Sequence, residues 1–113
     1  MMIRMPRGDI RLVRFVIEDP DHKTTRVDFS EIYFTVKKTT RDKPFLFQKK
    51  LTNDEIVKLD HGDYQLRIEP EDTNELAYGN YKFDVQLEYE NEIKETFVGD
   101  FIITEEVTYA ENE

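Results

Sequence analysis

The chain has 113 residues and no cysteine, and its 25 acidic and 16 basic residues give a formal net charge of −9. Without cysteine it forms no disulfide and no thiolate metal site, and an acidic surface of this strength repels nucleic-acid phosphates and anionic membranes. We therefore expect a single domain over residues 1–113 that binds neither nucleic acid nor membrane.

The first twenty residues, MMIRMPRGDIRLVRFVIEDP, contain no apolar block as long as a signal peptide or a membrane span, because charged residues interrupt them repeatedly. We expect no signal peptide. The segment includes Arg-Gly-Asp at residues 7–9, a tripeptide that integrin ligands carry, but a three-residue match is frequent by chance. We interpret Gly8 instead as a bend that leads into the following strand.

Alternation of apolar and polar residues predicts strands along the first half of the chain, since successive side chains of a strand point to opposite faces. The predicted strands there are 12–17, 32–36, 44–50, 55–60 and 64–68. In 44–50 we expect Phe45 and Phe47 to point inward. The basic residues of 37–43, with Lys49 and Lys50, are interpreted as lysines on exposed strand ends, which oppose edge-to-edge aggregation.

The turn EPEDTNEL, residues 69–76, is strongly acidic. Its carboxylates could supply hard oxygen ligands to calcium, but their spacing matches no EF-hand loop. We interpret the segment as a solvated turn in which Asp72 caps backbone amides. Capping-box spacing at 52–55 and at 72–75 predicts a single helical turn at each place.

The clearest alternation runs from Tyr81 to Tyr89 and predicts a strand with one apolar and one polar face. A tight turn at Glu90-Asn91 would join it to a strand over 93–98 and form a hairpin. A last strand follows over 100–110, with Gly99 as a bulge or kink inside a long terminal strand.

Short strands at intervals of about ten residues, with turn residues between them, predict an all-β fold. We expect an immunoglobulin-like antiparallel β-sandwich of about seven or eight strands. Its structural corner would be formed by Asp72, Gly79 and Tyr81, with the Tyr81 hydroxyl bonded back to the backbone as in a tyrosine corner. The alternative is that Tyr81 is an ordinary inward-facing aromatic residue.

No residue set predicts catalysis, and we expect no catalytic residue, no cofactor and no metal site. The only serine is Ser30, and the only histidines, His22 and His61, fall in predicted turns, so no nucleophile has a base nearby. Exposed tyrosines are the candidates for contact with a partner, because tyrosine anchors protein interfaces. These candidates are Tyr78, Tyr33 and Tyr109.

Several runs together resemble a known family of phage proteins. They are RGDIRLVRF, DFSEIYFTVKKT, LFQKKL, YQLRIEPEDTNELAYGNYKFDVQLEY and GDFIITEEVTYAENE. The chain is similar to the N-terminal domain of the baseplate upper protein of bacteriophages and prophages of Gram-positive bacteria. The most specific part is 68–85. The resemblance implies an immunoglobulin-like sandwich without catalysis. It also implies a virion structural protein, made in the host cytoplasm, that docks to other tail or baseplate proteins.

One alternative function remains open from the sequence, and so does the oligomeric state. The chain could be a carbohydrate-binding or adhesion module, because β-sandwiches often present tyrosines to glycans. It could also form a homo-oligomer, since unpaired edge strands can join two copies of one chain.

Overall fold

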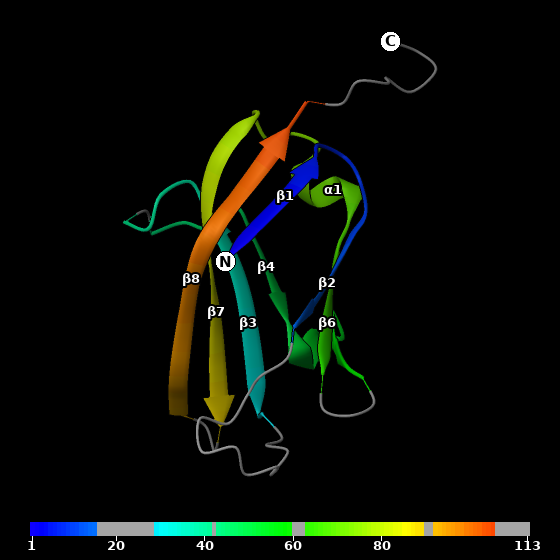
Figure 1. Ribbon diagram of the computed structural model, residues 1–113. Helices are drawn as coiled ribbons and strands as arrows, with labels where there is room; N and C mark the ends of the chain where they lie inside the picture. Colours follow the sequence, from blue (N-terminus) through cyan, green and yellow to red (C-terminus); the bar gives the residue numbers. More distant parts are fainter. Residues whose placement is uncertain (16–28, 42, 60–62, 90–91, 106–113) are drawn as a thin grey trace.

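Two β-sheets lie face to face around one apolar core in the computed structural model of the chain (Figure 1). The structure describes residues 1–15, 29–41, 43–59, 63–89 and 92–105. Within these ranges eight strands are present, and helix is confined to two short turns. The predicted all-β sandwich is therefore confirmed, while its immunoglobulin-like connectivity stays a prediction.

The large sheet has five strands in the order β1-β8-β7-β3-β4, and the small sheet has three in the order β2-β6-β5. The large sheet consists of β1 (Met2–Pro6), β8 (Glu92–Thr104), β7 (Gly79–Tyr89), β3 (Glu31–Lys37) and β4 (Phe47–Lys50). The small sheet consists of β2 (Arg11–Phe15), β6 (Tyr64–Ile68) and β5 (Ile56–Lys58). The two helical turns are η1 (Leu51–Asn53) and α1 (Pro70–Thr73).

Strand β1 departs from the expected antiparallel arrangement. It pairs in parallel with β8, from Met2 opposite Asp100 to Pro6 opposite Thr104, so the large sheet is mixed. The sequence pattern missed β1 because Arg4 interrupts its short apolar run, yet Ile3 and Met5 point inward and are buried. This pairing places the start of the chain at an edge of the large sheet.

Gly8 turns the chain from β1 in the large sheet to β2 in the small one. Its φ of 81° lies in the left-handed region, which glycine adopts without strain. Its backbone amide donates to the Thr73 hydroxyl at 2.8 Å. The interpretation of Gly8 as a bend is thus confirmed, and the bend is tied to α1.

Strands β7 and β8 form the predicted hairpin, but β8 runs unbroken from Glu92 to Thr104. The bulge expected at Gly99 lies elsewhere, where the register shifts between Leu87 and Glu88. A glycine is needed at position 99 because a Cβ there would lie 2.5 Å from the Met1 carbonyl oxygen and 2.7 Å from the Phe83 ring. Close packing, not strand irregularity, explains this glycine.

The core is formed by alternate residues of the strands, those whose side chains point toward the opposite sheet. Phe34, Phe47, Phe83 and Phe101 form a cluster of aromatic contacts between ring centroids 5.2–6.2 Å apart. Phe47 is buried as predicted, whereas Phe45 is 52% exposed and the prediction for it was wrong. Strand β4 begins only at Phe47, so alternation does not extend back to Phe45.

Three local predictions near β4, η1 and α1 need correction. Its capping box is formed by Glu69 and Asp72, and not by residues 72–75. The turn η1 has no side-chain cap. Lys49 was expected on an exposed strand end but is only 7% exposed. Its side chain lies on the same inward face of β4 as that of Phe47.

Candidate functional site

The predicted contact tyrosines lie apart and have intramolecular partners. Tyr78 stacks under Arg7, whose guanidinium carbon lies 4.3 Å from the ring centroid and whose Nη2 donates to the hydroxyl at 2.9 Å. Tyr33 is half-buried on the outer face of the large sheet, with Lys50 Nζ 5.6 Å from its ring centroid. Tyr33 faces Gln86, far along β7 from Tyr78. Tyr109 lies outside the described residues.

Two of the three residues predicted as a structural corner, Tyr81 and Asp72, form hydrogen bonds around α1 and the start of β7. The Tyr81 hydroxyl donates to the Ala77 carbonyl oxygen at 2.7 Å, which is the bond that a tyrosine corner requires. Gly79 has a φ of 138° and open space where a Cβ would stand, so it serves the backbone conformation. Asp72 accepts a hydrogen bond from the Glu69 amide at 2.7 Å, as a cap does.

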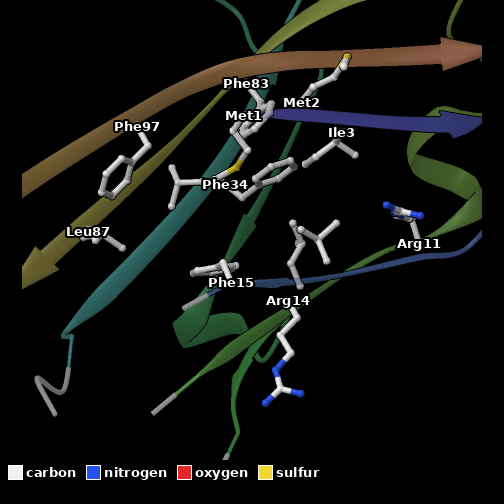
Figure 2. Close-up of a pocket in the computed structure, with 13 residues that line it drawn as sticks. Met1, Met2, Ile3, Arg11, Arg14, Phe15, Phe34, Phe83, Leu87 and Phe97 are labelled. Carbon is white, nitrogen blue, oxygen red and sulfur yellow. The ribbon is translucent and has the colours of Figure 1, made fainter. Parts of the chain in front are cut away.

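An apolar cavity of about 510 Å³ opens between the two sheets on the side where β1, β2 and β8 lie (Figure 2). Its inner surface is formed by core residues of β3, β6 and β7, among them Phe34, Leu66 and Phe83. Val13 and Phe15 line it from β2. Strands β1 and β2 are edge strands of different sheets, so the cavity lies at the edge of the sandwich.

Large apolar side chains stand exposed at the mouth of this cavity. Met1 is 72% exposed, Met2 59% and Phe97 44%, and all three line the cavity. Val98, 59% exposed, follows Phe97 on the opposite face of β8. Exposed apolar groups that gather at one place on a protein surface usually mark an interaction site. We call the cavity, with Met1, Met2 and Phe97 at its mouth, the open side.

The open side also contains a stretch of strand edge with which no described strand pairs. Strand β1 covers β8 only from Asp100 onward, and the Asp100 amide donates to the Met1 carbonyl at 3.1 Å. From Glu92 to Gly99, β7 is the only described neighbour of β8. Because backbone groups alternate in direction along a strand, Thr96 and Val98 direct their N–H and C=O groups toward this free edge, as Asp100 does.

Arg11 places a positive charge at the mouth of the cavity, although the chain is acidic overall. Arg11 and Arg14 both line it. Arg14 donates from Nε to Asp63 at 3.0 Å, so a carboxylate already balances its charge. Arg11 is exposed, and its side chain lies on the same face of β2 as Val13 and Phe15. Its charge therefore lies at the mouth of the cavity.

The outer face of the large sheet is a second candidate surface. Its centre is formed by Tyr33, Thr35 and Gln48, where Gln48 Nε2 donates to the Thr35 hydroxyl at 2.9 Å, and by Asp84 and Gln86 of β7. A groove of about 210 Å³ runs beside Asp84. Burial raises the pKa of the Asp84 carboxyl, and Lys37 opposes this effect.

Groups suited to metal binding or nucleophilic catalysis are sparse among the described residues. Within that part of the chain, no three His, Cys, Asp or Glu side chains are placed to hold a metal ion, and no helix is long and apolar enough to cross a membrane. The Ser30 hydroxyl donates to the Glu88 carbonyl oxygen at 3.1 Å. His22 and His61 lie outside the described residues.

The sequence predictions missed the open side. Two signals were present: the adjacent apolar residues Met1-Met2-Ile3 and Phe97-Val98, which place an apolar side chain on both faces of a strand. Such a pair breaks the rule of one dry and one wet face. The sequence could not show that Met1, Met2 and Phe97 line the same cavity, because that depends on the parallel pairing of β1 with β8.

Comparison with solved structures shows what the fold resembles. One match is the X-ray structure of an endo-β-1,4-mannanase from Thermotoga petrophila, with a TM-score of 0.58 and 12% sequence identity. The match covers 92% of this chain but 18% of that chain, so this chain spans less than a fifth of that protein's length. At this identity the likeness concerns the fold alone. No family model matches the sequence, and no curated protein matches it.

Proposed function

We propose that the chain is a non-enzymatic virion structural domain that binds other phage tail or baseplate proteins through the open side. The observation that carries the proposal is the exposure of Met1, Met2 and Phe97 around an apolar cavity. Each large apolar side chain that a partner covers contributes about 1.5–3 kcal/mol through removal of apolar surface from water. A few such residues at the centre of an interface dominate binding energy in most protein complexes.

The assignment to a virion is supported by the sequence resemblance. The most specific block of that resemblance, 68–85, contains α1 and the hydrogen bond between Tyr81 and Ala77. These features stabilise the fold on the side of α1, away from the free edge of β8 (Figure 1). The resemblance therefore supports the kind of domain, and the open side supports where a partner would bind.

The proposal is tested by reconstitution with the tail and baseplate proteins encoded beside the gene. We expect one of them to co-elute with the chain in size-exclusion chromatography. Phe97→Lys should weaken that complex at least tenfold, because it places a charge at the centre of the apolar contact. Val57→Lys is the matched control, since Val57 is similarly exposed, at 42%, but lies on β5.

Mass spectrometry of purified particles supplies a second measurement. Presence of the chain in particles, together with a complex that depends on Phe97, is the expected result. Absence from particles and failure to bind any of the neighbouring tail proteins would overturn the proposal.

A carbohydrate-binding function is the second candidate, because the outer face of the large sheet combines an aromatic ring with uncharged hydrogen-bonding groups. Gln86 of β7 lies opposite Tyr33, and Gln48 of β4 lies opposite Thr35, two residues along β3. The name of the mannanase that shares the fold is also that of a carbohydrate-active protein. A glycan array, with and without calcium, tests this function: Tyr33→Ala should abolish binding, whereas Tyr89→Ala, at the far end of β7, should retain it.

A further inference from the structure

We infer that the open side binds its partner by β-strand addition. An extended segment of the partner pairs with the free edge of β8 at Thr96 and Val98 and places an apolar side chain in the cavity. This inference rests on the proposed function, in which the open side is the contact surface, and it names the partner by its chemistry: a strand with bulky apolar residues at alternate positions.

The edge of β8 already receives a strand over the rest of its length. Strand β1 occupies it from Met2 to Pro6, and its first bond joins the Met1 carbonyl to the Asp100 amide at 3.1 Å. The next backbone N–H and C=O groups of β8 that point to this edge belong to Val98 and Thr96. No described strand pairs with β8 on this edge there. An added segment there would extend the large sheet past the point where β1 begins, with main-chain hydrogen bonds of the same kind.

The cavity determines which side chains the added strand must carry. Phe97, between Thr96 and Val98, directs its side chain to the cavity (Figure 2). In a paired strand, alternate side chains fall on the same face as Phe97 and would enter the space beside Met1 and Phe15. A volume of about 510 Å³ lies within the range of protein ligand pockets, so it accommodates large side chains.

The charge at the mouth adds a further requirement. Arg11 is exposed there, whereas Arg14 is paired with Asp63. An acidic residue next to the apolar positions of the added strand would meet Arg11, and a lysine would be repelled. The segment we infer therefore combines alternate apolar residues with a flanking carboxylate.

The test uses an array of overlapping nonapeptides from the tail and baseplate proteins encoded beside the gene, probed with the full chain. We expect bound peptides to share apolar residues at alternate positions. Methylation of the peptide backbone nitrogens that face β8 should reduce binding at least tenfold, and methylation at the intervening positions should leave it unchanged, because only one set of amides pairs with an edge.

Variants at Val98 test the same bonds from this chain. Val98→Pro removes the outward amide, and proline is tolerated on edge strands. Val98→Thr keeps the amide and the β-branched shape and serves as the control. We expect at least tenfold loss of peptide binding for Val98→Pro alone. If Val98→Pro does not fold, amide hydrogen exchange of the unmodified chain replaces it, with peptide-dependent slowing expected at Thr96 and Val98.

Binding that survives Val98→Pro and peptide methylation but is lost in Phe97→Lys would overturn strand addition and leave the proposed function standing. If no peptide binds while an intact tail protein does, strand addition is likewise overturned. Failure of every tail protein and every peptide to bind would instead overturn the proposed function. Dimers that Val98→Pro dissociates would show that the edge pairs with a second copy of this chain, which also contradicts the inference.

Discussion

Lys49 and Asp72 form a buried ion pair that joins β4 of the large sheet to α1. The Lys49 Nζ lies 2.7 Å from Asp72 Oδ2 and 3.9 Å from Glu55 Oε2, and the lysine side chain is only 8% exposed. The same Asp72 oxygen accepts the Glu69 amide that begins α1. One carboxylate thus caps a helical turn and neutralises a buried cation.

Removing the cation should destabilise the fold. We expect Lys49→Met to lower the free energy of unfolding by about 2–4 kcal/mol, because a partly buried carboxylate is left without its partner. Lys50→Met, at the next position on the opposite face of β4, should change it by about 0.5 kcal/mol or less. Urea denaturation of both variants measures the difference, and equal effects would contradict the role of the pair.

The hydroxyl of Tyr81 should contribute measurably to stability. Tyr81→Phe removes the bond to the Ala77 carbonyl and keeps the buried ring. We expect a loss of about 1 kcal/mol, the usual net value of such a hydrogen bond. Tyr89→Phe, at a residue that is 37% exposed, is the control and should have no measurable effect. The readout is the midpoint of urea unfolding.

Gly99→Ala should destabilise the chain by about 1–3 kcal/mol, the cost of overpacking a close contact. The added methyl group would meet the Met1 carbonyl and the Phe83 ring. If this explanation holds, Phe83→Leu in the same chain should recover part of the loss. A double-mutant cycle measures that coupling, and strictly additive effects would count against it.

Asp84 should make stability depend on pH. Burial raises the pKa of its carboxyl above the ordinary value of 3.8, against the effect of Lys37. The folded chain therefore holds the proton more tightly than the unfolded chain does. The stability that Asp84 contributes is present below the ordinary pKa and is lost as the pH rises through the raised pKa.

Asp84→Asn should therefore be more stable than the original chain at neutral pH and differ little from it at acidic pH. Denaturation midpoints at about pH 3 and about pH 7 provide the comparison, with the two values chosen on either side of the titration. A stability difference of the same size at both values would contradict the assignment. Lys82, which also lines the groove beside Asp84, is unchanged in both chains.

The sequence by itself determined the all-β class and most of the strands, because alternation is a local property of a strand with one buried face. Strands β6 and β7 follow that pattern closely. The Gly8 bend and the Asp72 cap were also predictable, since each depends on residues near in sequence. Strand β1 escaped prediction because five residues with a central arginine carry too weak a pattern.

Only the tertiary structure decided what depends on residues far apart in the chain. The parallel pairing of β1 with β8 brings Met1 to the same cavity as Phe97, and among the described residues it covers the β8 edge only from Asp100 onward. The burial of Lys49 likewise depends on Asp72, which lies on the far side of β5 and β6 in the sequence. Alternation shows which face of a strand is apolar, but it does not show which neighbour covers that face, because strand pairing is a long-range choice.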